Sequence, residues 1–342
     1  MKYFTHPAGK FIIKIPVEWQ YKNIEAGYKE ENPYSFELYD NEDTGCFQIS
    51  SYSEQEKPFK KTLKIQPYNT DKLEFLNQRM DGGGFNMHLW YAIVEDHLFM
   101  AKYIYDTGKE NSDEIIKELK KVEKSLETLQ LLSPDKWEKA IEIDRYEKFN
   151  ASLAASFDLL YKAYENESFI EIIIIIANQI DAYLRLAIVM TKQLNDKTNN
   201  IDTTFLYQGE GDKPIFERKI YSIAQELCII DSQLFNKLES LYGERNKMVH
   251  RYIISDLKTR EILFLSKDYV EVCEEVRLIL QSTENRQFKE QIGIHGGNRN
   301  PEEEHTPENI TLIHSLVNDK HLLERLKRKI ENPESNNPPP NN

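Results

Sequence analysis

Residues 244–252 include the side-chain types that could act on a phosphodiester. Arg245 offers a fixed positive charge for phosphate oxygens, and His250 offers an imidazole, a group that ordinarily titrates near neutral pH and can move a proton. Asn246 and His250 are four residues apart, so on a helix they share one face. Arg245 lies about 140° round an ideal helix from His250. Its long side chain, or a bend at Gly243, would have to bring guanidinium and imidazole together.

The surrounding residues 133–284 predict an all-α domain that positions this stretch. Ser133, Pro134 and Asp135 are typical of a helix start, and from there the apolar residues recur with the period of a helix. The β-branched run 172–176 could form a strand by itself, but its long periodic continuation favours a helix. The polar segment 195–212 is long for a loop in a compact domain, which indicates mobility or function. We expect five up-and-down helices, with Arg245 and His250 on the fourth.

This pattern resembles the signature of the HEPN superfamily: an arginine, a polar residue, three further residues and a histidine on a late helix. The stretch from Asn178 to Arg185 adds to it, because it resembles an acidic, small-apolar, Leu-Arg sequence on an early long helix of such domains. The resemblance covers about 140 residues. It implies a metal-independent endoribonuclease of a bacterial defence or toxin type, in which the RNA 2′-hydroxyl attacks the adjacent phosphate and leaves a cyclic phosphate and a 5′-hydroxyl.

The resemblance also implies a role for each residue. His250 would be the general base or acid, and Arg245 would hold the phosphate and stabilise the charge on its oxygens. Asn246 would orient the phosphate or the imidazole, while Asp181 would fix the tautomer of His250 or tether Arg245. RNA would be contacted by Lys247 and Arg251. The expected assembly is a homodimer with the two motifs facing each other, and no cofactor or metal is required.

The alternative is a non-catalytic module of the same HEPN-like type that binds nucleotides or proteins or serves for dimerisation. A purely structural interpretation is also open: Arg245 pairs with a carboxylate such as Asp181 or the Glu244 of a neighbour, and His250 is a satisfied interface histidine. The surface around His250 distinguishes the two hypotheses. An open cleft on which Arg245, Lys247 and Arg251 converge favours catalysis, whereas a packed apolar surround favours a scaffold.

The first segment, residues 1–132, predicts an α+β domain: an antiparallel sheet closed by a helix. Alternating runs at 34–40 and 46–52 predict one hairpin, and those at 87–94 and 97–105 predict a second. Residues 112–130 repeat with a helical period. The first strand, ended by Pro16 and followed by Trp19, together with the helix end at 125–129, is similar to the PsbP-like fold and to a small bacterial domain of unknown function. That resemblance implies a fold and no chemistry. We expect the glycines at 82–84 to form a hairpin turn.

Composition limits the possible partners. The net charge of −13 argues against broad nucleic-acid binding, so any RNA contact would be confined to a local basic cleft. The most apolar run, 169–190, is interrupted by charged residues and does not predict a membrane span. Cys46, Cys228 and Cys273 lack metal-ligand spacing and are typical of reduced thiols in a cytoplasmic protein. Residues 285–342 predict a linker, an amphipathic helix at 309–330 and a disordered tail; this helix or the first domain could dock a protein partner.

Overall fold

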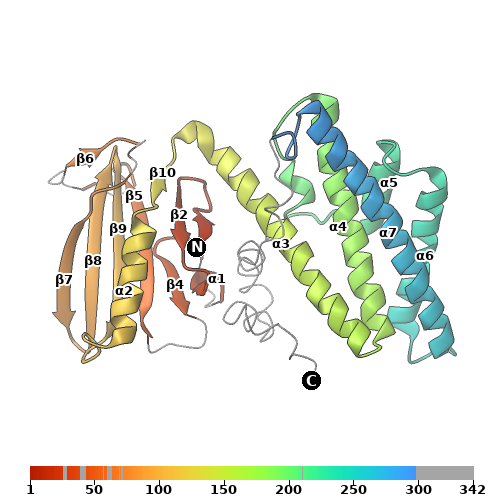
Figure 1. Cartoon of the computed structure of the whole chain (residues 1–342), viewed down its shortest axis with the longest axis horizontal. Helices are drawn as coiled ribbons and strands as arrows, with labels where there is room; N and C mark the ends of the chain where they lie inside the picture. Colours follow the sequence, from red (N-terminus) through yellow and green to blue (C-terminus); the bar gives the residue numbers. More distant parts are fainter. Residues whose placement is uncertain are drawn as a thin grey trace, which may run out of the picture. The chain divides into compact units, whose positions relative to one another are not determined.

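A computed structural model describes residues 1–25, 29–38, 44–56, 58–59, 64–68, 70, 72–209 and 211–297. The chain divides into two compact units, of which the first contains Met1–Ile141 and the second begins at Glu142. The first is rich in β-strands and the second is helical, as the sequence predicts (Figure 1). The division falls inside a long helix, some residues after the boundary expected at 132. The helix predicted at 309–330 and the predicted tail lie outside the described residues.

The first unit contains two sheets. The smaller has the order β1-β2-β10 and consists of β1 (Lys2–Thr5), β2 (Phe11–Ile15) and β10 (Gln130–Leu131). The larger has the order β3-β4-β5-β9-β8-β6, with β7 also paired to β8. Its strands are β3 (Trp19–Tyr21), β4 (Tyr34–Leu38), β5 (Cys46–Ser53), β6 (Ile65–Gln66), β7 (Leu76–Gly82), β8 (Phe85–Val94) and β9 (His97–Asp106). A short helix, α1 (Lys22–Glu25), follows β3.

Both predicted hairpins are present. Strands β4 and β5 pair antiparallel, and so do β8 and β9. Burial alternates along β9, because successive side chains point to opposite faces of a strand. The glycines at 82–84 form the turn between β7 and β8, where Gly83 and Gly84 take positive φ angles of 49° and 106°. One expectation is corrected: β6 pairs parallel with β8, so the sheet is mixed rather than antiparallel.

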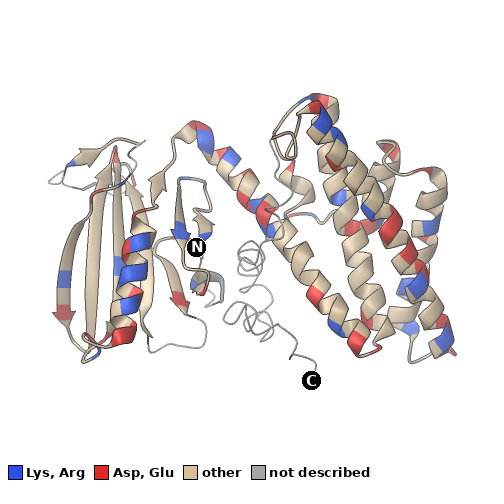
Figure 2. Ribbon diagram, in the orientation of Figure 1, with Lys and Arg blue, Asp and Glu red and all other residues tan. Residues whose placement is uncertain are grey.

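Helix α2 (Asp113–Leu126) closes the sheet with one apolar face. The Ser112 hydroxyl caps it by accepting from the backbone N–H of Ile115 at 3.3 Å, and the charged residues along it are visible in Figure 2. The buried Trp19 Nε1 donates to Glu118 Oε2 at 2.8 Å, which joins β3 to the helix. At the helix end, Thr128 Oγ1 accepts from the backbone N–H of Lys14 at 2.8 Å and joins the helix to β2.

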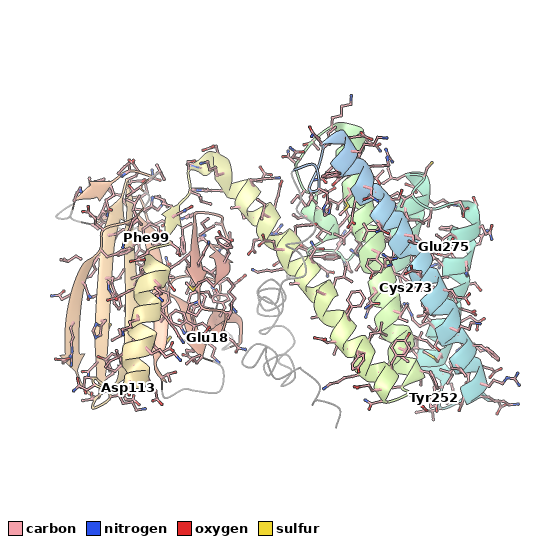
Figure 3. The ribbon with its side chains drawn as sticks, in the orientation of Figure 1. Glu18, Phe99, Asp113, Tyr252, Cys273 and Glu275 are labelled. Atoms are coloured by element: carbon pink, nitrogen blue, oxygen red, sulfur yellow. The ribbon has the colours of Figure 1, made fainter. Side chains whose placement is uncertain are left out.

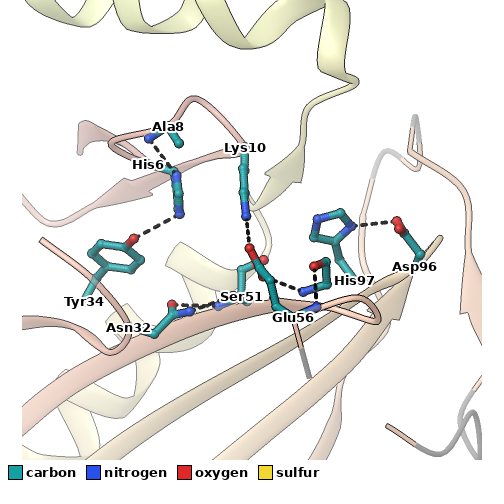
Figure 4. A network of polar contacts seen from close by, with 10 residues as sticks. His6, Ala8, Lys10, Asn32, Tyr34, Ser51, Glu56, Asp96 and His97 are labelled. Carbon is teal, nitrogen blue, oxygen red and sulfur yellow. Dashed lines mark hydrogen bonds and ion pairs between the residues drawn. The ribbon is translucent and has the colours of Figure 1, made fainter. Parts of the chain in front are cut away.

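A polar network lies beside β5 in this unit (Figure 4). His6 Nδ1 accepts from the backbone N–H of Ala8 at 2.9 Å, and His6 Nε2 is 3.0 Å from the hydroxyl of Tyr34. Lys10 forms an ion pair with Glu56 at 2.5 Å. Burial and then the charge of Lys10 lower the pKa of His6 to about 4, so this imidazole is neutral in the folded protein near neutral pH.

The second unit is built from helices. A 3₁₀ turn at Pro134–Lys136 leads into α3 (Trp137–Glu165), and another 3₁₀ turn, Thr203–Phe205, lies between α4 and α5. The remaining helices are α4 (Phe169–Asp196), α5 (Glu217–Glu226), α6 (Ser232–Arg251) and α7 (Thr259–Glu290). Arg245 and His250 therefore lie on the fourth long helix of the unit, as expected. Helix α7 is longer than predicted and runs past the domain end expected at Glu284.

Helix α4 is the core of this unit and packs along α7 (Figure 1). Residues 172–176 are helical despite their β-branched side chains, because burial on most sides outweighs the small loss of helix propensity. Among the described residues, α4 is the one helix long and apolar enough to cross a membrane, but 72% of its apolar window is buried within the protein. This burial is compatible with the core helix of a soluble protein.

Candidate functional site

Helix α6 carries the stretch singled out by the sequence. The Asp231 carboxylate caps its start by accepting from the backbone N–H of Leu234 at 2.8 Å. Its buried apolar residues are Leu234, Leu238, Leu241 and Met248. Arg245 falls four residues after Leu241 and three before Met248, so it occupies a position in the core-facing stripe. His250 lies on another side of the helix, in line with Asn246, and is exposed.

Arg245 is held by a carboxylate from α5. Its Nη1 donates to Glu217 Oε1 at 2.9 Å and its Nη2 donates to Glu217 Oε2 at 2.7 Å, and the guanidinium lies 4.9 Å from the ring centroid of Tyr242. The two side chains are only 14% and 16% exposed. Tyr221 also donates its hydroxyl hydrogen to Glu217. This is a paired, half-buried arginine, held with the bidentate geometry that guanidinium and carboxylate prefer.

The pair controls the charge states around it. Burial lowers the pKa of the Arg245 guanidinium, but the bonds to Glu217 outweigh burial and the net shift is upward. Burial raises the pKa of the Tyr221 hydroxyl, and the Glu217 charge raises it further. Arg245 therefore remains a cation and Tyr221 remains a neutral donor at any physiological pH.

Asp181 has a different partner from either one expected. Its Oδ2 accepts from Arg185 Nε at 2.5 Å, one helical turn further along α4. No hydrogen bond joins Asp181 to Arg245 or His250 in the described part of the chain, although the charges of Glu217 and Arg245 act on it. Burial is the largest influence and raises the pKa of Asp181. The Asp181 carboxylate therefore pairs with Arg185 within α4.

His250 lies in a groove of about 420 Å³ at the end of α6. We name the residues that line this groove, apart from the buried Met248, the α6-end surface: Ile170, Ile174, Val249, His250, Tyr252, Ile253 and Ile254. Tyr252 lies at the end of the bundle where α6 stops (Figure 3). Within the described residues the imidazole has no hydrogen-bond partner, and Lys247 and Arg251 are exposed but do not line the groove.

The structure thus brings together only some of the predicted residues. Arg245 Nη2 reaches Asn246 Oδ1 at 3.5 Å, which is long for a hydrogen bond. Asp181 and His250 line different cavities. The surround of His250 is apolar, without convergence of Arg245, Lys247 and Arg251. This surround is apolar but exposed rather than packed, so it matches in full neither of the two surroundings expected from the sequence.

Sequence reasoning missed Glu217, the main partner of Arg245. The helical spacing places Arg245 on the same face as Leu234, Leu238 and Leu241, which predicts a half-buried cation that pairs with a carboxylate. The spacing does not indicate which of the 57 acidic residues provides that carboxylate. Across the described residues, no group of three or more His, Cys, Asp or Glu side chains is arranged to hold a metal ion.

No family model matches the chain, and no curated protein matches it. A protein of Bacteroides thetaiotaomicron VPI-5482, known from a crystal structure at 1.50 Å resolution, is similar at 18% sequence identity with a TM-score of 0.27. The match covers 39% of this chain and 49% of that one, so this chain spans about half the length of its neighbour.

Proposed function

We propose that the helical unit is a self-association module of HEPN-like type in a cytoplasmic protein, and that two copies of the chain meet through the α6-end surface. The observation that carries the proposal is the exposure of Ile253 and Ile254, whose relative exposures are 94% and 81%. Val249 and Tyr252 are about half exposed beside them. Contiguous apolar patches on the surface of a protein mark sites at which another molecule binds.

The energetic argument is one of magnitude. Burying an isoleucine side chain contributes roughly 1.5–3 kcal/mol. Four such side chains, two from each copy, would contribute about 6–12 kcal/mol, against a cost of association of roughly 4–15 kcal/mol. Burial of Ile253 and Ile254 therefore roughly offsets the cost of association. Burial of Val249 and Tyr252 would add the further free energy that makes the dimer stable.

A second copy is the occupant that this surface fits best. In a two-fold dimer the same surface is used on both sides, so an apolar surface meets an equally apolar one. The HEPN resemblance implies a dimer in which the two motif stretches face each other. The α6-end surface contains His250, the last residue of that stretch, so pairing through it would have this geometry.

Sedimentation equilibrium of the full chain tests the proposal. We expect the wild type to be dimeric at micromolar concentration and the double variant Ile253→Asp/Ile254→Asp to be monomeric, with unchanged helical content by circular dichroism. The matched control is Leu278→Asp, which changes an exposed apolar residue on α7 that does not line the groove. A monomeric wild type, or loss of the dimer in Leu278→Asp alone, contradicts the proposal.

The second candidate function is the metal-independent ribonuclease, favoured by one observation: the unpaired His250 imidazole lies within the surface that a dimer would cover. Pairing would bring two imidazoles near each other, and Lys247 and Arg251 of both copies would double the local positive charge. His250 would then act as general base or acid for attack of a 2′-hydroxyl on the adjacent phosphate. Glu217 already binds Arg245, so the RNA phosphate would have to bind Arg251 instead, unless the Arg245–Glu217 ion pair opened.

An RNA cleavage assay in EDTA separates this candidate from a purely associative role. Cleavage by the wild type that leaves a cyclic phosphate, together with its loss in His250→Ala, supports catalysis; Arg218→Ala on α5 is the control for loss of a surface cation. His250 is exposed, so its substitution leaves the core intact. Equal cleavage by wild type and His250→Ala would remove the ribonuclease candidate without affecting the dimer proposal.

A further inference from the structure

The helical unit contains a second cavity, away from the α6-end surface. Its volume is about 540 Å³, and its walls come from α3, α4 and the connection between α4 and α5. Its charged lining residues are the cations Arg145, Arg185 and Lys213 and the carboxylates Asp181 and Asp212, and uncharged polar groups include Asn178 and Tyr207. This volume lies within the range typical of small-molecule sites, roughly 300–1,000 Å³.

Arg185 fixes the wall of this cavity. Its Nε binds Asp181, its Nη1 donates to the carbonyl oxygen of Phe205 at 3.1 Å, and its Nη2 donates to the carbonyl oxygen of Ile215 at 2.7 Å. Each guanidinium nitrogen is therefore occupied, and two distant points of the α4–α5 connection are attached to α4. The cavity is preformed, because its shape depends on buried hydrogen bonds rather than on a ligand.

Two other cations at the cavity have no carboxylate partner. Arg145 Nη1 donates to Thr203 Oγ1 at 3.1 Å and its guanidinium lies 4.3 Å from the ring centroid of Tyr207. Neither Arg145 nor Lys213 forms an ion pair with any described residue. In a chain with a net charge of −13, two unneutralised cations lining one cavity favour an anionic ligand group.

Asp181 belongs to the wall of the cavity. Its Oδ1 is buried out of reach of a water-sized group and has no hydrogen-bond partner among the described residues, while its Oδ2 is bound by Arg185. Neither oxygen is therefore free to receive a ligand donor. The amide of Asn178 also lines the cavity and makes no side-chain hydrogen bond to the described residues.

From these features we infer that the cavity binds a small organic anion. The anionic group, a carboxylate or a phosphate, lies at Arg145 and Lys213. A polar group of the ligand lies at the amide of Asn178. The remaining body of the ligand packs against apolar wall residues such as Phe149 and Leu206. Amino or hydroxy carboxylic acids and nucleoside monophosphates share this chemistry.

Isothermal titration calorimetry of the full chain tests the inference with four probes: L-glutamine, L-malate, 5′-AMP and 5′-GMP, each up to 5 mM. Binding of the first two alone assigns a carboxylate ligand, and binding of the last two alone assigns a nucleotide. We expect a sub-millimolar Kd for at least one probe and a weakening of at least tenfold in Arg145→Gln. Absence of binding by all four probes overturns the inference.

Two variants connect any binding to this cavity. Lys213→Gln removes the second cation of the cavity, and should weaken the same probe at least tenfold while retaining the helical circular dichroism of the wild type. Arg218→Gln removes an arginine from α5 that is paired with Glu239 and does not line the cavity, and should leave the Kd unchanged. Equal binding by Arg145→Gln and the wild type would assign the ligand to another part of the chain and overturn the inference.

Discussion

Removing the carboxylate of Glu217 should destabilise the helical unit, because Arg245 would remain half-buried without its counter-charge. Breaking a buried ion pair from one side costs roughly 3–5 kcal/mol, whereas an exposed pair contributes about 0–1 kcal/mol. Arg245 and Glu217 are 14% and 16% exposed, which places them nearer the buried case. Tyr221 would lose its acceptor as well. We expect Glu217→Ala to lower the free energy of unfolding by about 2–4 kcal/mol, measured by urea denaturation.

The same two helices provide the control. Arg218 on α5 forms an equally bidentate pair with Glu239 on α6, but Arg218 is 61% exposed. We expect Glu239→Ala to cost at most about 1 kcal/mol. The double variant Glu217→Leu/Arg245→Met should be more stable than Glu217→Ala by at least about 1 kcal/mol, because no uncompensated charge remains, but it should stay below the wild type because Tyr221 still lacks its acceptor. If Glu217→Ala costs no more than Glu239→Ala, Arg245 is not a structural cation and is free to bind phosphate.

Three further predictions concern the rest of the molecule. The pKa of His6 is lowered from 6.5 to about 4 in the folded protein, so the unfolded chain binds the proton first as the pH falls. The free energy of unfolding should therefore fall by about 3 kcal/mol between pH 6.5 and pH 4. The urea midpoint should depend less on pH in His6→Asn than in the wild type, and an equal pH dependence in the two proteins would contradict this prediction. Gly9→Ala should lower the free energy of unfolding by at least about 2 kcal/mol, because φ at Gly9 is +71° and an added Cβ would lie 2.3 Å from the carbonyl oxygen of Trp137. Gly83→Ala, where an added Cβ meets open space, should lower it less in the same urea denaturation assay. Arg185→Met should speed proteolytic cleavage within residues 197–216 about tenfold, because the carbonyl oxygens of Phe205 and Ile215 lose their hydrogen-bond donor. An unchanged cleavage rate would show that other contacts hold the α4–α5 connection in place.

Local patterns predicted most of the fold. Short apolar runs separated by a turn marked β8 and β9, and the helical period marked α4 even where residues 172–176 favour a strand. Short strands such as β6 and β10 escaped notice, because two residues contain no periodicity and their pairing depends on distant partners. The extent of α7 was underestimated for a related reason: its last turns carry mostly polar residues, yet the buried Gln287 continues the core there by donating to the carbonyl oxygen of Met190 at 3.1 Å.

The candidate site shows the limit of spacing arguments. The spacing of Arg245 and His250 indicated that they lie about 140° apart, and in the structure Arg245 faces the core while His250 faces solvent. Which carboxylate binds Arg245 depends on how α5 packs on α6, and sequence separation does not encode that packing. The charge of Arg245 acts on Asp181, but the Asp181 carboxylate binds Arg185, one turn away on the same helix. Asp181 thus pairs with the arginine one turn away on α4 rather than with Arg245 or His250 on α6.

Disulfide cross-linking at the α6-end surface tests the central claim most directly. In a Cys228→Ser background, which removes the exposed native thiol, Ile253→Cys places a thiol at the most exposed point of the surface. In a two-fold dimer centred there, the introduced thiol of one copy would meet that of the other within disulfide range. We predict a cross-linked dimer on mild oxidation of Ile253→Cys and none with Leu278→Cys on α7. Cross-linking of Leu278→Cys with none at position 253 would contradict self-association through this surface.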